Sequence, residues 1–189
     1  MPHAARFVLA SFVLWLPLAC AHGAPPSPAV ASVPSSPSAA APPAAGERLL
    51  VDPQAWPQLS SALAGSWRGP DDRVRLESLA IANGSALLQR WRFAGGGETI
   101  DVFFADGEGM GVTHYCNQGN QATLQAVARE GDAWVFEQRG VTNFVAGSSA
   151  LCRLSVRVQG DALSMDEQYC DATGTPVGAP ERVAFTRMP

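Results

Sequence analysis

The chain has 189 residues, and its 13 basic residues, all arginine, stand against 17 acidic residues, every one at or beyond Glu47. Residues 47–189 therefore carry a net charge of −5, from 12 arginines and 17 acids. A mildly acidic domain without a basic stripe argues against nucleic acid, whose binding needs many cations that neutralise phosphates. The absence of lysine also excludes a Walker-type phosphate loop, a Schiff-base nucleophile and a Ser-Lys dyad.

Residues 1–19 have the pattern of a signal peptide. Arg6 precedes an apolar run from Phe7 to Leu18, which is too short to cross a bilayer as a stable helix. The run ends in LPLAC, which resembles the lipobox of bacterial lipoproteins, with Pro17 where that motif usually has an aliphatic residue. We therefore expect export to the bacterial cell envelope.

The lipobox resemblance implies that Cys20 becomes a lipid anchor, which would make the chain a membrane-attached lipoprotein carrying palmitate-like acyl chains. Ala21, rather than Asp, follows the cysteine and resembles the outer-membrane form of the sorting signal, on the periplasmic side. The alternative is ordinary cleavage at a small-residue site, which would release a soluble periplasmic or secreted protein.

Residues 20–46 follow as a tether. Between Ala24 and Gly46 the chain has seven Pro, eight Ala and five Ser, with no charge. Such a tract cannot bury enough apolar surface to offset the entropy of ordering it, and its prolines favour extended conformations. We expect a disordered linker between the anchor and a folded domain at residues 47–189.

Residues 47–189 predict an all-β domain. Prolines stop at Pro70 and return at Pro176, while glycines recur between them, as a long strand meander requires. A short helix is expected over 52–64, with Trp56, Leu59 and Leu63 at helical spacing. Hairpin turns rich in Gly, Asn and Asp then separate strands expected at 67–69, 73–82, 86–93, 99–105, 110–116, 122–129, 133–139, 151–158, 163–170 and 182–187. Eight to ten such strands close most simply into an antiparallel up-and-down barrel.

Alternation within the strands predicts which side chains are apolar neighbours on one face. The clearest sets are Leu87, Trp91 and Phe93; Ile100, Val102 and Phe104; Trp134 and Phe136; and Leu154, Val156 and Val158. A small barrel is either filled by such side chains or holds one small ligand between them. We take Trp91, Phe104, Trp134 and Phe136 as candidate ligand-binding residues, with a packed core as the alternative.

The helix followed by Gly65-Ser66-Trp67 and a meander resembles the calycin superfamily, the lipocalins and their relatives. The resemblance implies a lipocalin-like barrel in which an arginine from a late strand, Arg187 or Arg182, packs over the tryptophan. A second segment, THYCNQGNQ from Thr113, is similar to uncharacterised secreted bacterial proteins of about this domain's size. Those relatives commonly continue with Pro and a basic residue, where this chain has Ala122 and Thr123, and they imply no established activity.

Histidine and cysteine are the side chains of the domain that could bind a metal or act in catalysis. The domain has one histidine, His114, and three cysteines, Cys116, Cys152 and Cys170. His114 and Cys116 are two residues apart on a strand and so share a face. In a simple meander all four groups gather at one mouth of the barrel, provided that residues 141–150 form a loop.

Three interpretations of this cluster stay open. The first is a disulfide between Cys152 and Cys170, which flank a hairpin, with Cys116 as a free thiol. A two-residue turn in that hairpin places Leu154 opposite Glu167 and Cys152 opposite Tyr169, so direct pairing of the cysteines needs a bulge or a longer turn. The second is a metal site on His114 with cysteine ligands, which has no CxxC or HxxxH spacing. The third is a Cys116 thiolate activated by His114, for which no orienting acid is identified.

Other chemistries find less support. The sequence has no Gly-x-Ser-x-Gly elbow, and neither a resident cofactor nor a metal is indicated. Adjacent acids at Asp71-Asp72 and Asp166-Glu167 are typical of a solvated surface. We therefore expect an envelope lipoprotein whose barrel binds a small apolar or amphipathic ligand without catalysis. The alternatives are a protein-interaction or inhibitor module with a packed interior, whose partner the sequence does not identify, and a Cys/His-dependent enzyme.

Overall fold

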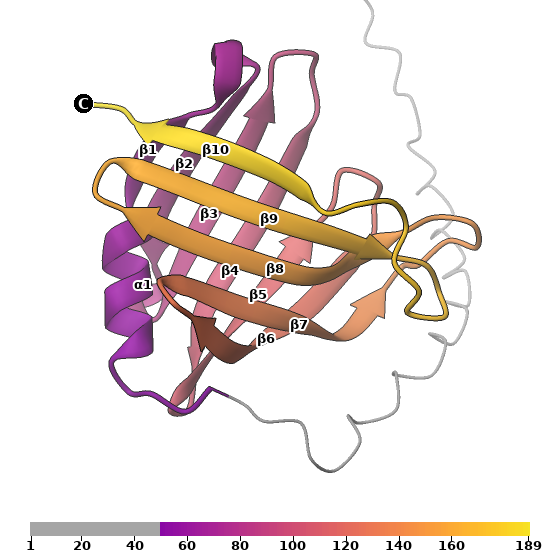
Figure 1. The fold of residues 1–189 in the computed structure, drawn as a ribbon, viewed down its shortest axis with the longest axis horizontal. Helices are drawn as coiled ribbons and strands as arrows, with labels where there is room; N and C mark the ends of the chain where they lie inside the picture. The colour runs from indigo at the N-terminus through magenta and orange to yellow at the C-terminus, as the bar shows by residue number, and fades with distance from the viewer. Residues whose placement is uncertain (1–49) are drawn as a thin grey trace, which may run out of the picture. The chain divides into compact units, whose positions relative to one another are not determined.

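The computed structural model describes residues 50–189, which form one closed antiparallel β-barrel (Figure 1). The expected signal peptide, the Cys20 anchor and the tether at 20–46 lie outside the described residues. Around the barrel the strands follow chain order, with β1 closing onto β10. The elements are α1 (Ala55–Leu63), β1 (Gly65–Arg68), η1 (Pro70–Asp72), β2 (Val74–Ile81), η2 (Ala82–Gly84), β3 (Ala86–Phe93), β4 (Glu98–Asp106), β5 (Gly109–Tyr115), β6 (Gln121–Glu130), β7 (Ala133–Thr142), β8 (Ala150–Gln159), β9 (Ala162–Cys170) and β10 (Glu181–Arg187).

This architecture confirms the expected all-β barrel with a short N-terminal helix. Each expected strand is present, although most bounds move by one to three residues because hydrogen bonding, not composition, ends a strand. The helix begins at Ala55 and buries Ala55, Leu59 and Leu63, whereas Trp56 is only half-buried and donates to the Gly84 carbonyl at 3.2 Å. No helix within residues 50–189 has the length and apolar character needed to cross a membrane.

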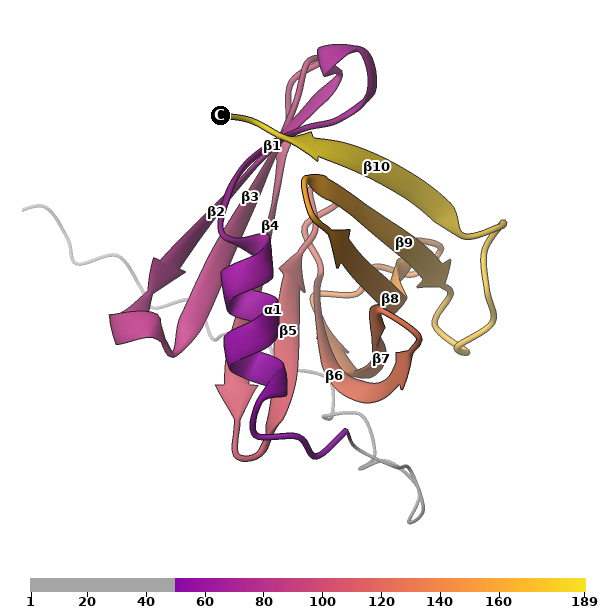
Figure 2. The ribbon, with the colours of Figure 1, turned by 60° about the vertical axis from the view of Figure 1, so that its left-hand side comes forward.

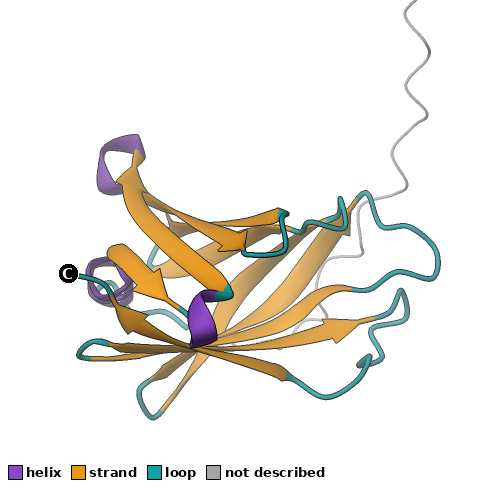
Figure 3. Ribbon diagram, turned by 90° about the horizontal axis from the view of Figure 1, so that it is seen from above, coloured by secondary structure: helices purple, strands orange, loops and turns teal. Residues whose placement is uncertain are grey.

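The helix α1 lies at one end of the barrel, beside the hairpin turns that join β2–β3, β4–β5, β6–β7 and β8–β9 (Figures 1 and 2). The chain entering α1 is fastened there, because Leu50 N–H donates to the Ala126 carbonyl and Asp52 N–H to the Glu108 carbonyl, each at 3.0 Å. The opposite end, which we call the mouth, carries the connections at 69–73, 94–97, 116–120, 143–149 and 171–180. Figure 3, from above, shows the longest loops extending past the strand ends on the side of the molecule away from the C-terminus.

Trp67 and Arg187 join the first strand to the last. The Arg187 guanidinium stacks 4.0 Å from the centre of the Trp67 ring, and it donates to the Ala64 carbonyl at 2.6 Å and the Ala62 carbonyl at 2.9 Å. Trp67 itself is fully buried and donates to the Leu63 carbonyl at 2.8 Å. Arg187 thus caps the last turn of α1 and closes the barrel with one side chain, as the calycin resemblance implied, while Arg182 pairs with Asp166 at the surface.

A disulfide joins Cys152 and Cys170, whose Cα atoms are 5.6 Å apart. The expected register of the β8–β9 hairpin is confirmed, since Leu154 pairs with Glu167 and Val156 with Met165. A bulge between Leu151 and Arg153 then shifts the register, which brings the two cysteines together in the way that the sequence required. Cys116 is the free cysteine of the described chain.

The packed core occupies the half of the barrel nearer α1. Side chains from every strand meet there, among them Trp67, Leu76, Leu87, Phe103, Val112, Leu124, Phe136, Leu154, Val156 and Leu163. Phe103 and Phe136 make an edge-to-face contact with ring centres 5.7 Å apart. The interior of this half is therefore solid, and any ligand space lies nearer the mouth.

Candidate functional site at the barrel mouth

A band of polar side chains crosses the inside of the barrel above the packed core. Ser78, Gln89, Asp101 and His114 are register partners on β2, β3, β4 and β5, and all four are buried. We call them the polar layer. Gln89 donates to the Ser78 hydroxyl at 3.0 Å. The other two members of the layer, Asp101 and His114, form an ionisable pair. Buried polar groups persist where they are hydrogen-bonded, and buried ionisable residues beside a cavity are candidates for a functional site.

Asp101 is the centre of the ionisable pair. Its Oδ1 accepts a hydrogen bond from His114 Nδ1 at 2.8 Å, and its Oδ2 accepts one from Trp91 Nε1 at 2.7 Å. Both the Asp101 and the His114 side chains are almost fully buried, at 1% and 2% exposed. Trp91 and Asp101 thereby fix the orientation of the imidazole ring, and the Nε2 edge of that ring is left for other partners.

His114 Nε2 is buried without a well-formed hydrogen bond to any residue of the described chain, as is Oε1 of Gln89. Burial alone would lower the pKa of His114, but the carboxylate of Asp101 outweighs it and raises that pKa to about 10. The imidazole is then protonated at neutral pH and its Nε2–H is a donor. A buried donor of this kind favours an acceptor atom supplied from the cavity beside it.

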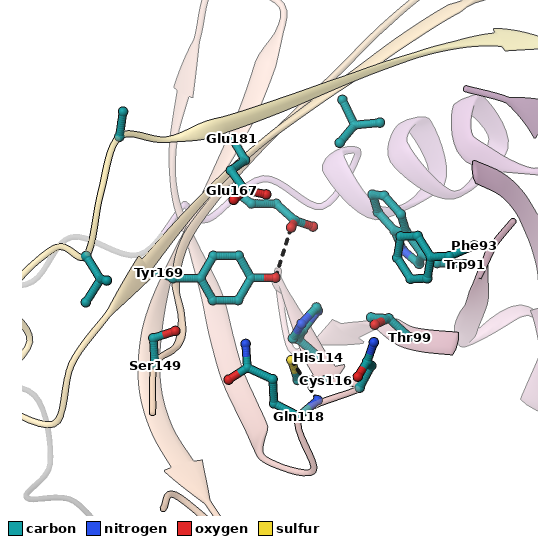
Figure 4. Close-up of a pocket in the computed structure, with 14 residues that line it drawn as sticks. Trp91, Phe93, Thr99, His114, Cys116, Gln118, Ser149, Glu167, Tyr169 and Glu181 are labelled. Atoms are coloured by element: carbon teal, nitrogen blue, oxygen red, sulfur yellow. Dashed lines mark hydrogen bonds between the residues drawn. The ribbon is translucent and has the colours of Figure 1, made fainter. Parts of the chain in front are cut away.

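A cavity of ≈ 360 Å³ lies between the polar layer and the mouth (Figure 4). His114 of β5 and Cys116, the first residue after β5, face Glu167 and Tyr169 of β9 across it, and the Trp91 ring stands at one side. The remaining lining residues are Phe93, Thr99, Asn117, Gln118, Ser149, Val177, Ala179, Glu181 and Val183. A volume of this size is at the low end of small-molecule sites, and the wall combines apolar surface with a few converging polar groups.

Glu167 and Tyr169 form the second wall. The Tyr169 hydroxyl donates to Glu167 Oε2 at 3.0 Å. Burial, together with the charge of Asp101, raises the pKa of Glu167 to about 7, and burial beside Glu167 also raises the pKa of the Tyr169 phenol. The expectation that Asp166 and Glu167 are both solvated is wrong for Glu167, which is 9% exposed and points inward opposite Leu154.

The structure brings three of the six candidate ligand-binding residues together at the cavity: Trp91, His114 and Cys116. Trp134 and Phe136 lie in the packed core instead. The inward alternation expected for Ile100, Val102 and Phe104 is wrong, because Thr99, Asp101 and Phe103 are the buried set on β4. The Phe104 ring covers Gly111, where an added Cβ would come within 2.4 Å of it, so the glycine makes room for an outward aromatic ring.

The three interpretations of the cysteine cluster now separate. The disulfide is confirmed, and it consumes two of the thiolates that a metal site on His114 would have used. Within residues 50–189 no group of three or more His, Cys, Asp or Glu side chains is arranged to hold a metal ion. The reactive-thiol interpretation gains the orienting acid that the sequence did not reveal, Asp101.

Glu167 gives the site a measurable pH signature. Because its folded pKa is near 7 and its ordinary value near 4.5, the native state binds more protons than the unfolded state between those values. We therefore expect the free energy of unfolding to fall as pH rises from about 4.5 to 7. Glu167→Gln removes this slope in urea titrations across that range, whereas Asp166→Asn, on the outer face of the same strand, retains it. Equal slopes in wild type and Glu167→Gln would contradict the assignment.

A closed antiparallel barrel with a packed base and a half-open mouth cavity is the class that these observations define. No family model matches the chain, and no curated protein sequence matches it. Among solved structures it is similar to Rv2717c from M. tuberculosis, with a TM-score of 0.51 and 19% sequence identity, over 71% of this chain and 98% of that chain. At that identity the likeness shows the fold alone, which is compatible with a calycin-like barrel.

Proposed function

We propose that the barrel binds a small amphipathic molecule in the mouth cavity. The observation that carries the proposal is the half-open cavity of ≈ 360 Å³, in whose wall the buried Nε2 of His114 makes no well-formed hydrogen bond within residues 50–189 besides its contact with the Cys116 thiol. An acceptor oxygen of the ligand would accept the Nε2–H bond, and its apolar part would contact Trp91 and Val183. We therefore expect a ligand with one polar end and one apolar end.

A bulky residue at the cavity wall tests this proposal. Val183 of β10 lines the cavity, and Ala184, its neighbour, points outward and is exposed. We expect Val183→Trp to weaken binding of the amphipathic probe 8-anilinonaphthalene-1-sulfonate by at least about tenfold, a loss near 1.4 kcal/mol. The matched variant Ala184→Trp should leave affinity unchanged. Fluorescence titration measures both, and equal affinities in the two variants would sink the proposal.

Native mass spectrometry of the protein from its own envelope provides the complementary measurement. A small molecule that leaves on Val183→Trp substitution supports the cavity as its site. Its absence from wild-type protein, together with no affinity for the probe, counts against a carrier role.

We further propose that Cys20 anchors the barrel to the envelope, with residues 20–46 as the tether. The support is the sequence alone: the apolar run, the LPLAC pattern and the uncharged Pro/Ala/Ser tract. Metabolic labelling with palmitate should mark the wild-type chain and not Cys20→Ser.

A second candidate function is docking of another envelope protein onto the mouth loops. Tyr115, Val145 and Val177 are exposed apolar side chains at this end, 47%, 64% and 51% exposed. Pull-down from envelope extract distinguishes this candidate, because it requires a stoichiometric protein partner that Val145→Asp and Val177→Asp release.

A further inference from the structure

We propose that Cys116 is a nucleophile for acyl transfer, activated by His114 and oriented through Asp101, and that the ligand class of the mouth cavity includes small activated esters and thioesters. The inference deepens the proposed binding function and rests on it, since the substrate must enter the same cavity. The proposed function gives the mouth cavity a ligand, and this inference adds a reaction of that ligand with Cys116.

The first support is the order of the three groups along the strands. Asp101 on β4 holds His114 Nδ1 at 2.8 Å, and Cys116 follows His114 by two residues, directly after the end of β5, with both side chains lining the cavity. Figure 4 shows the Cys116 sulfur beside the imidazole ring. Acid, imidazole and thiol thus form the arrangement in which a base activates a nucleophile and a third group orients the base.

The second support is the electrostatics of the thiol. Partial burial and the charge of Glu167 would raise the pKa of Cys116, but contact with His114 and the backbone N–H of Gln118, 3.5 Å from the sulfur, outweigh them. The pKa of Cys116 is therefore lower than that of an ordinary thiol. A protonated imidazole beside a thiolate is the state in which cysteine attacks carbon.

The third support is access. Cys116 is partly exposed, lines the cavity, and has no disulfide partner within residues 50–189, where Cys152 and Cys170 are joined to each other. Asn117, Gln118 and Ser149 add amide and hydroxyl groups to the same wall. Such donors can stabilise the negative oxygen that forms when a carbonyl is attacked.

The reaction balances with the groups in the cavity and water. The Cys116 sulfur forms a bond to the acyl carbon, the bond to the alcohol or thiol leaving group breaks, and His114 Nε2 gives its proton to that leaving group. Neutral His114 then takes a proton from water, whose oxygen attacks the thioester. The carboxylic acid leaves, and the thiolate–imidazolium pair is restored.

The experiment uses the full chain with 4-nitrophenyl acetate as the acyl donor, and peptide mass mapping locates the adduct. We expect acetylation at Cys116, a burst of 4-nitrophenol followed by slower turnover, and no Cys116 adduct in Cys116→Ser. We also expect alkylation of wild-type Cys116 by iodoacetamide to be half-maximal at a pH below the value of about 8.5 typical of a free cysteine. An ordinary pH dependence, or acetylation without turnover, would overturn the proposal.

Variants separate activation from folding. His114→Asn should slow acetylation by about a hundredfold or more, because Cys116 loses the imidazolium that favours its thiolate and the group that protonates the leaving group. Asp101→Asn, as a change in a positioning residue, should shift the alkylation profile to higher pH. The control is Thr113→Ser, which alters the residue before His114 on the other face of β5 and should leave both measurements unchanged. If the histidine variant does not fold, the wild-type pH profile decides alone.

The outcome for binding is independent of the outcome for acyl transfer. Binding of 8-anilinonaphthalene-1-sulfonate to the wild type is measured on the same preparation, before the acyl donor is added. Retained binding with unreactive wild-type Cys116 would refute the acyl-transfer inference and leave the proposed function standing, whereas loss of cavity binding in wild type would refute both.

Discussion

Replacing Asp101 with alanine is expected to lower the free energy of unfolding by about 3–5 kcal/mol, because it strips a buried charge of its partner. The carboxylate receives hydrogen bonds from both His114 and Trp91, and its side chain is 1% exposed. Without it, the imidazole either loses its proton or stays charged without the carboxylate, and the indole N–H is left unpaired in a low-dielectric interior. Urea unfolding at pH 7 under oxidising conditions measures the loss.

The matched control for this variant is Glu77→Ala. Glu77 also pairs with a neighbouring-strand residue, Arg92, but on the outer surface with half of its side chain exposed. Its removal should cost less than about 1 kcal/mol. A loss below that value for Asp101→Ala would contradict the buried ion pair. Proton NMR gives a second readout, since the pKa of His114 should drop from about 10 once the carboxylate that outweighs its burial is removed.

Removal of the Cys152–Cys170 disulfide by a double change to alanine is expected to cost about 3 kcal/mol. The bond closes a loop whose ends are 18 residues apart, and the chain-entropy model assigns roughly this stabilisation to such a loop. The bond also lies next to Tyr169, so we expect weaker binding of the fluorescent probe in the mouth cavity. Urea unfolding and probe titration measure the two effects.

Reduction of the wild-type protein supplies the control. Dithiothreitol should lower the stability of the wild type to that of the double variant and should leave the variant unaffected. A variant as stable as the oxidised wild type would show that the bulged hairpin is held by its strand pairing alone.

Several features of the barrel could be predicted from local sequence. The spacing of turns and the alternation within strands indicate a meander, and Gly65-Ser66-Trp67 indicates its first strand. The β8–β9 register followed from the two-residue turn, and with it the need for a bulge before Cys152 and Cys170 could pair. These predictions succeed because a hairpin is a local structure, whose turn length determines its register.

The prediction for β4 failed because both faces of that strand have apolar residues. Ile100, Val102 and Phe104 form the more hydrophobic set, yet the inward set contains Asp101. Pairing with β5 decides the question, since Phe104 lies opposite Gly111 and Phe103 opposite Val112. A strand shifted by one residue exchanges its inward and outward faces. Because the other face of β4 was expected to point inward, the sequence did not identify Asp101 as the acid that orients His114.

The wrong prediction that Glu167 is solvated has a different cause. The expected register already placed it opposite Leu154, on the inward face, so its burial was available to the sequence analysis. Its neighbour Asp166 obscured this, because adjacent acids suggest a solvated surface, although alternate residues of a strand face opposite ways.

The sequence by itself determined the class of fold and the two residues, His114 and Cys116, where chemistry is concentrated. The division into signal peptide, tether and domain remains an expectation from the sequence. Only the tertiary structure decided what surrounds them. Asp101, Trp91, Glu167 and Tyr169 reach the site from three other strands, and contacts between strands far apart in the chain depend on register and closure rather than on local spacing. The charge state of His114 is likewise a property of the assembled barrel, because both its burial and its carboxylate partner exist only after folding.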